Sequence, residues 1–148
     1  MNEDMYLLDT NVLSHLSETH RSSAFFLTRC RVPSDVLYEA RWHPPAEYEV
    51  EYLTTARVLT HLQRVMLCVP VGDPTLVNLY ANKGTADPML VACALDATED
   101  SSAVLFGPEW VIVSNDIAVR RTAAHFHIRT LAREEFLAHV QDSWHDAS

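Results

Sequence analysis

The chain has 148 residues, 48% of them hydrophobic and 21% charged, which suits one compact domain that buries about two-thirds of its chain surface. Its longest apolar runs are far shorter than the roughly 20 residues of a membrane helix, so no membrane span is expected. The formal net charge of -9 excludes a protein that holds nucleic acid by lysine and arginine neutralisation alone, and a polyanionic substrate would need a cation, a local arginine patch or a basic partner.

Short apolar runs alternate with segments of helical period in the first half of the chain. Ser34 is of the type that caps a helix N-terminus, and the dipeptide Pro44-Pro45 is expected to stop the helix that Ser34 begins. The longest helical pattern lies between residues 46 and 64. We therefore predict, in order, a strand at 5–8, helices at 11–18 and 23–30, an extended piece at 31–33, and helices after Ser34 and at 46–64.

The second half continues this alternation. Asp87-Pro88 opens a helix, with proline at the favoured first helical position, and the segment between Ala97 and Trp110 is expected to be a loop or insertion. The predicted elements are a buried strand at 65–69, helices at 74–81 and 87–98, a strand at 110–113, a helix at 116–124, a strand at 127–129 and a helix at 132–140. They imply one α/β domain over residues 1–148, with a central, mainly parallel sheet and helices on both faces.

The cysteines indicate a reducing environment. Cys30, Cys68 and Cys93 are odd in number, form no CxxC pair and lie among apolar neighbours, so we expect three small core residues and no structural zinc. The first residues, MNEDMY, carry acids where a secretory signal carries positive charge, which favours a cytoplasmic protein.

The histidines do not predict a metal site. His15 follows the first acidic residue in a predicted helix and is expected to be a surface or packing histidine. His125 and His127 have the spacing of one strand face, but no cysteine or third histidine lies near them. His43, beside Trp42 and two prolines, is expected to pack in a loop, with contact to an RNA base or a partner as the alternative.

Four acidic residues stand next to buried segments. Asp9 directly follows the first strand, and Asp116 follows the apolar run WVIV after Ser114. Glu39 lies in a helix among apolar residues, and Asp87 precedes the apolar run MLVACAL. Each has an ordinary explanation taken singly, because aspartate caps helices and a helical glutamate pairs with an arginine. Taken together they favour one acidic site, because parallel strands bring their carboxyl ends to the same edge of a sheet.

The chain resembles PIN-domain nucleases in the order and separation of four motifs. These are LLDTN at Asp9, the helical Glu39, ADPMLVACAL at Asp87 and VIVSND at Asp116. In size and layout it is similar to the small bacterial VapC-like toxins of type II toxin–antitoxin pairs, and the resemblance covers nearly the whole chain. It implies a PIN-like fold and cleavage of RNA.

The resemblance also implies a metal site. Mg²⁺ and Mn²⁺ prefer hard oxygen ligands and retain waters, which suits phosphodiester hydrolysis. Asp9 and Asp116 are expected to hold the principal metal, with Asp87 helping directly or through water. Glu39 would position the attacking water or a second metal. The polar residues that match the family's supporting positions are Thr10, Asn11 and Ser114.

The sequence and the resemblance each suggest binding partners. Arg120 and Arg121 begin the helix after Asp116 and are candidates for phosphate contacts, with a solvated helix face as the ordinary alternative. The family implies a small basic antitoxin that presents an arginine to the acidic pocket, and a homodimer.

Other classes of protein remain open. The first is a PIN-like binding module without catalysis, and the second is a PIN nuclease of RNA processing that has no antitoxin. A receiver domain needs a lysine at a later strand end, whereas Lys83, the only lysine, lies in a predicted loop. A phosphatase-like domain needs a second aspartate two residues after the first, and position 11 is asparagine.

Overall fold

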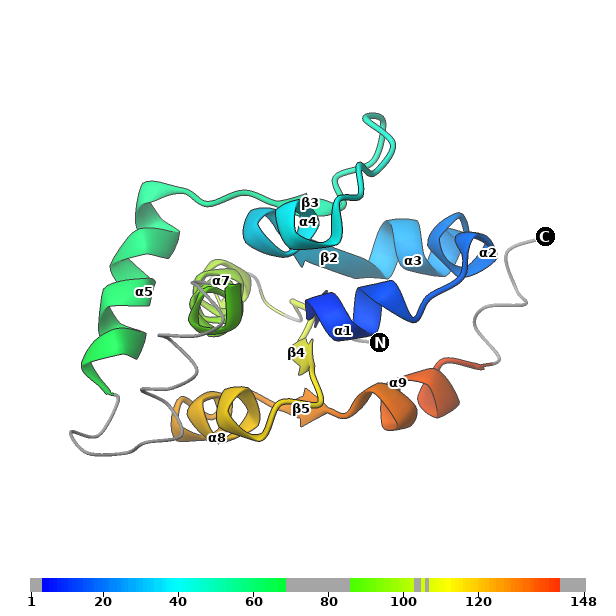
Figure 1. The fold of residues 1–148 in the computed structure, drawn as a ribbon. Coiled ribbons are helices and arrows are strands. Elements are labelled where there is room, and N and C mark those ends of the chain that lie inside the picture. Colours follow the sequence, from blue (N-terminus) through cyan, green and yellow to red (C-terminus); the bar gives the residue numbers. More distant parts are fainter. Residues whose placement is uncertain (1–3, 69–85, 103–104, 106, 142–148) are drawn as a thin grey trace.

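The structure is a computed structural model that describes residues 4–68, 86–102, 105 and 107–141 (Figure 1). Its sheet has five strands in the order β3-β2-β1-β4-β5, and each neighbouring pair is parallel. This confirms the predicted α/β fold with a parallel central sheet. The strands are β1 Met5–Leu8, β2 Cys30–Pro33, β3 Glu51–Tyr52, β4 Trp110–Val113 and β5 Thr130–Leu131.

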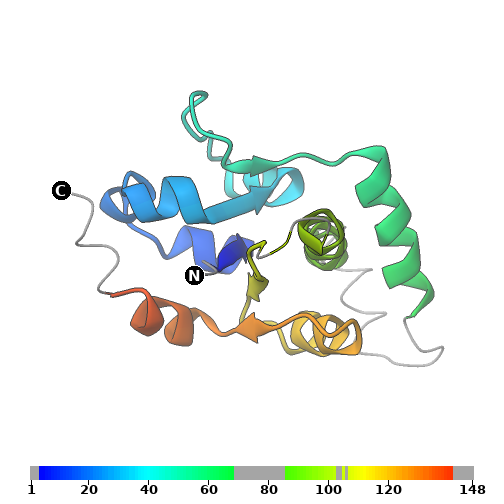
Figure 2. The ribbon, with the colours of Figure 1, turned by 180° about the vertical axis from the view of Figure 1, so that it is seen from behind.

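Helices cover both faces of the sheet, as predicted. Figures 1 and 2 show α5, α7 and α8 on one side of it and α1, α2, α3 and α9 on the other. None of the helices within the described residues is long and apolar enough to cross a membrane. The helices are α1 Thr10–Ser14, α2 Glu18–Arg21, α3 Ala24–Arg29, α4 Ser34–Ala40, α5 Ala56–Leu67, α7 Ala86–Ser102, α8 Ile117–His125 and α9 Arg133–His139.

The alternating side chains of β1 join two hydrophobic cores. Tyr6 and Leu8 belong to the core beneath α1, α3, α4 and α9, whereas Leu7 belongs to the core beneath α5, α7 and α8. Successive side chains of a strand point to opposite faces, so one short apolar strand serves both layers. Because β1 lies in the middle of the sheet and is buried on both faces, the end of this strand is held firmly in place.

Two predicted elements of the first half need correction. The helix expected at 11–18 is interrupted: α1 ends at Ser14, and α2 begins after Ser17, whose hydroxyl accepts a hydrogen bond from the backbone N–H of His20 at 3.1 Å. Ser34 does not cap α4, because its hydroxyl donates to Glu51 at 2.7 Å instead. The helix also ends before the two prolines, at Arg41, which has a left-handed backbone with φ of 54°.

The predicted helix at 46–64 is correct in its second part only, and the predicted strand at 65–69 is wrong. The first part of this stretch contains β3, which pairs with β2, and α5 begins only after Thr55, whose hydroxyl accepts from the N–H of Val58 at 3.2 Å. The helix continues through Val65 to Leu67, so the expected strand is helical up to that residue. The end of that strand and the helix predicted at 74–81 lie outside the described residues.

The last elements are displaced from their predicted positions. Helix α7 continues to Ser102, so the expected loop between Ala97 and Trp110 is partly helical. The strand predicted at 127–129 is found at β5, because α8 ends at His125 and His127 has a left-handed backbone with φ of 61°. These two histidines therefore do not share a strand face.

The three cysteines differ in their environments. Cys30 and Cys93 are buried, as predicted, but Cys68 is exposed at the end of α5, so its assignment to the core is wrong. Burial is the main reason that the pKa of the Cys93 thiol rises to about 12, and the charges of Asp96 and Asp35 add to this effect. Cys93 is therefore an uncharged thiol at neutral pH.

Helices α5 and α7 are joined by a polar network as well as by apolar packing. Asp96 of α7 is 5% exposed, and it accepts a hydrogen bond from the Tyr52 hydroxyl at 2.7 Å and another from Arg57. Burial alone would raise the pKa of Asp96, but the hydrogen bonds from Arg57 and Tyr52 outweigh it and the pKa is lowered. His61 Nε2 of α5 lies 2.6 Å from Glu99 Oε2 of α7, between the same two helices. These bonds hold α5 against the helix that begins near Asp87.

Candidate functional site

Asp9 and Ser114 connect the ends of two neighbouring strands. Strands β1 and β4 are paired so that Leu8 lies opposite Val113, and Asp9 and Ser114 come directly after them. The Ser114 hydroxyl donates a hydrogen bond to Asp9 Oδ2 at 2.7 Å, and Oδ1 accepts from the backbone N–H of Thr10 at 2.7 Å. Asp9 is 7% exposed and Ser114 is fully buried. The carboxylate that begins α1 is therefore fixed in orientation by both strands.

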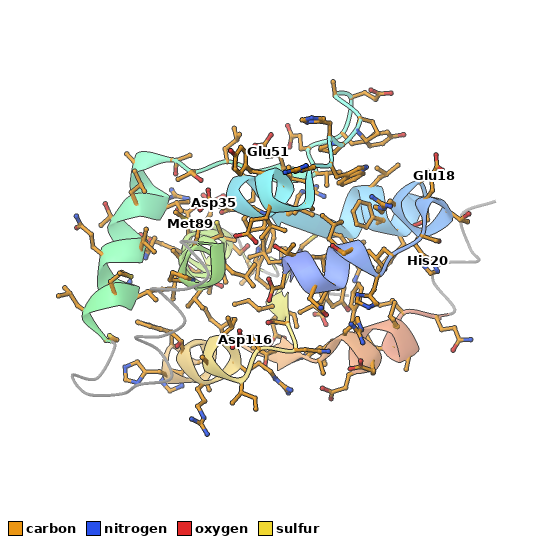
Figure 3. The ribbon with its side chains drawn as sticks, in the orientation of Figure 1. Glu18, His20, Asp35, Glu51, Met89 and Asp116 are labelled. Atoms are coloured by element: carbon orange, nitrogen blue, oxygen red, sulfur yellow. The ribbon has the colours of Figure 1, made fainter. Side chains whose placement is uncertain are left out.

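Asp116 is attached to the same pair. Its backbone N–H donates to the Ser114 hydroxyl at 3.0 Å, and its side chain caps α8 by accepting from the N–H of Ala118 at 2.9 Å. Figure 3 shows Asp116 between β4 and the first turn of α8. The cap explains why the helix begins there. One serine hydroxyl thus contacts the carboxylate of Asp9 and the backbone N–H of Asp116.

Glu39 joins the site from α4, which packs against α1. The hydroxyl of Thr10 donates to Glu39 Oε2 at 2.9 Å, so the residue after Asp9 holds the glutamate. The Glu39 side chain is otherwise exposed. Three of the four acids predicted from the sequence are therefore connected through Thr10 and Ser114 at the carboxyl ends of β1 and β4.

The fourth acid, Asp87, lies in the first turn of α7, but its side chain is outside the described residues. A further acid, Asp35, was not selected from the sequence. Asp35 lies one turn before Glu39 in α4, and Figure 3 shows it beside Met89 of α7. Its charge acts on the pKa of Cys93, which also places the carboxylate close to α7. The spacing of four residues between two acids on a short helix is the sequence feature that indicates Asp35.

The donor atoms suit a hard divalent cation. All the side chains joined here offer carboxylate, hydroxyl or amide oxygen, and neither thiolate nor imidazole is among them, which is the chemistry that Mg²⁺ and Mn²⁺ prefer. Both oxygens of Asp9 accept protein hydrogen bonds, one from the backbone N–H of Thr10 and one from the Ser114 hydroxyl. Among the side chains that the structure describes, no three of the His, Cys, Asp and Glu type lie close enough to hold a metal ion, and Asp87 is not one of these side chains.

Arg120 and Arg121, the candidates for phosphate contacts, both lie on α8. Arg120 donates to the Thr130 hydroxyl at 3.3 Å and lies 3.6 Å from Glu135, so it is engaged with β5 and α9, while Arg121 is exposed on α8. The arginine that contacts the site is Arg133, which donates to Asn11 Oδ1 at 2.8 Å. The two residues are 122 positions apart, and no local pattern in the sequence marks this contact.

Comparisons with known proteins do not assign this chain to a family. A scan against models of protein families and a search of the curated proteins both find no match. The fold and the site therefore define an α/β protein with an acidic, oxygen-rich edge at the carboxyl ends of its central strands. The PIN-domain family stays a prediction from the sequence motifs.

Proposed function

We propose that this protein is a metal-dependent endoribonuclease that hydrolyses RNA phosphodiester bonds. The observation that carries the proposal lies at the carboxyl ends of β1 and β4, where the Ser114 hydroxyl binds the Asp9 carboxylate and the backbone N–H of Asp116. The Thr10 hydroxyl binds the Glu39 carboxylate beside them. Ligands of open parallel sheets bind at this edge. The order of the motifs, which is similar to that of PIN-domain nucleases, and the oxygen-only donor set support the same conclusion.

The residues have separable roles in this proposal. Asp9 and Asp116 would hold Mg²⁺ or Mn²⁺, with Asp87 as a further ligand, direct or through water. The ion would bind a phosphate oxygen, acidify the attacking water and stabilise charge on the leaving oxygen. Ser114 keeps Asp9 Oδ2 in one orientation, and Thr10 directs the exposed Glu39 carboxylate so that it can orient the water.

A panel of transfer and ribosomal RNA fragments tests this function. The wild-type chain is incubated with the panel in Mg²⁺, in Mn²⁺ and in excess chelator. We expect internal cuts in at least one RNA with either ion and none with the chelator, and strong loss of cutting in Asp87→Asn. The matched control is Asp100→Asn, which removes an exposed carboxylate from the same helix and should cut like the wild type.

The panel also separates the proposal from its alternatives. If the folded chain cuts no RNA with any ion, or if Asp87→Asn cuts as well as the control, the nuclease proposal is wrong and a PIN-like binding module takes its place. Cutting that survives the chelator would contradict the metal dependence.

We also propose the biological setting that the motif resemblance implies: a VapC-like toxin that acts in the cytoplasm as a homodimer and is inhibited by a small basic antitoxin. The acidic net charge and the acidic edge are complementary to such a partner. A short reading frame for a basic protein beside the gene, and co-purification of its product with this chain, would support the toxin. Absence of such a neighbour would favour a PIN nuclease of RNA processing.

A further inference from the structure

Arg133 is fastened beside both candidate metal ligands. Its backbone N–H donates to Asn115 Oδ1 at 2.6 Å, and its Nη1 donates to Asn11 Oδ1 at 2.8 Å. Asn115 immediately precedes Asp116, and Asn11 follows Asp9 by two residues. Because β5 lies next to β4 in the sheet, the start of α9 reaches the same edge as the two aspartates. A positive charge is thus held next to the acidic site.

His15 also contacts the side chain of Arg133. Its Nδ1 lies 2.8 Å from the backbone oxygen of Asn11 and carries the hydrogen that this oxygen accepts. Arg133 Nη1 lies 3.1 Å from both Nδ1 and Nε2, so the guanidinium contacts the imidazole ring. The Asn11 amide that accepts from Nη1 is uncharged. Asn11 and His15 hold the guanidinium in place, and neither brings a negative charge to it.

The remaining edge of the guanidinium has the shape that binds phosphate. Nη1 is occupied by α1, so the edge formed by Nε and Nη2 is the one presented to a ligand, and this edge matches two oxygens of one phosphate. Nη2 donates to Glu134 at 2.8 Å, but the Glu134 side chain is 63% exposed, and an exposed ion pair is weak. No hydrogen bond from Nε is found within the described part of the chain.

We propose that Arg133 binds a backbone phosphate of the RNA beside the one that is cleaved, and that His15 and Asn11 are positioning residues for it. This inference rests on the proposed function, since it names how that substrate is held. It also supplies the local cation that a polyanionic substrate requires on a chain with a net charge of -9. A phosphate would displace Glu134 from Nη2 and bond to both Nε and Nη2.

The salt dependence of RNA binding tests the phosphate contact without cleavage. Binding of a short single-stranded RNA is measured in Mg²⁺ at several salt concentrations, in an Asp9→Asn background checked for folding. Arg133→Gln should weaken binding by roughly tenfold. It should also make the negative slope of log affinity against log salt shallower by about 0.7, the value for one phosphate contact on a single strand. Arg133→Lys should keep most of the slope, because it keeps the charge.

Arg129→Gln is the matched control. It removes one arginine charge at the opposite edge of the sheet, where Arg129 pairs with Asp4 and Glu109, and it should leave the slope unchanged. An unchanged slope in Arg133→Gln, an equal fall in the control, or no RNA binding by the parent chain would each overturn the phosphate contact.

The positioning role of His15 is tested by combining variants. His15→Ala should weaken RNA binding only through Arg133, so the double variant should bind no worse than Arg133→Gln alone. Additive losses would show that His15 does not act through the arginine.

In cleavage assays, Arg133→Gln should raise KM more than it lowers kcat. If RNA binding depends on Arg133 but the wild-type chain cuts no RNA, the nuclease proposal fails and the phosphate contact stands. If the chain cuts RNA but the salt dependence of binding does not change in Arg133→Gln, the nuclease proposal stands and the phosphate contact fails.

Discussion

Asparagine in place of Asp9 is expected to reduce RNA cleavage by roughly a thousandfold, which corresponds to about 4 kcal/mol of lost transition-state stabilisation. The substitution removes the charge that a divalent cation needs. It keeps a side-chain oxygen for the N–H of Thr10, and asparagine caps a helix about as well as aspartate. The fold should therefore survive, and single-turnover cleavage of the RNA identified from the panel measures the loss directly.

Ser114→Ala provides the comparison for this result. It leaves the Asp9 carboxylate in place but removes the hydroxyl that binds its Oδ2 and accepts from the N–H of Asp116. Loss of such an orienting group reduces activity by about 10- to 100-fold in metal sites. Asp9→Asn should therefore be clearly slower than Ser114→Ala. Equal rates for the two variants, or a folded Asp9→Asn protein that cuts normally, would remove Asp9 from the catalytic site.

Phe136→Ala is expected to lower the free energy of unfolding by about 3–5 kcal/mol, because it leaves a cavity in the centre of one core. Phe136 of α9 is fully buried and meets the ring of Tyr6 of β1 edge to face, with 5.1 Å between centroids. This ring anchors the helix that carries Arg133 onto the central strand. Urea denaturation followed by circular dichroism measures the change.

Leu67→Ala is the control for that experiment. Leu67 is 85% exposed at the end of α5, and its truncation should change the unfolding free energy by no more than about 0.5 kcal/mol. A cost below about 1 kcal/mol for Phe136→Ala would mean that α9 is not packed on the sheet as the structure has it. The placement of Arg133 beside Asn11 would then lose its support.

The central strands and the acids after them could be predicted because both are local features. Strands β1 and β4 are short apolar runs, and Asp9 and Asp116 follow them at helix starts. In a parallel sheet the carboxyl ends of neighbouring strands lie close together, so residues far apart in the sequence are expected to meet there. The hydrogen bond between Ser114 and Asp9, which are 105 positions apart, is such a contact. Glu39 was selected for its place in a helix among apolar residues and for a motif, and the structure places its carboxylate on the Thr10 hydroxyl.

The errors arise where distant contacts decide the local structure. The helix predicted at 46–64 begins too early, because β3 pairs with β2 at the edge of the sheet and Thr55 caps a helix that begins only afterwards. Arg133 was missed for a similar reason. Its place beside Asn11 depends on how Phe136 packs α9 against β1, whereas Arg120 and Arg121 were selected because they are close to Asp116 in sequence.

Binding of Mn²⁺ to the purified chain tests the central claim most directly, because it asks whether these acids hold a cation at all. A titration followed by electron paramagnetic resonance compares the wild type, Asp9→Asn and the exposed-site control Asp100→Asn. The account predicts binding that Mg²⁺ displaces, normal affinity in the control, and affinity reduced at least about tenfold in Asp9→Asn. A wild-type chain that binds no Mn²⁺, or equal binding by the folded Asp9→Asn protein, would contradict it and leave Asp9 as the N-cap of α1.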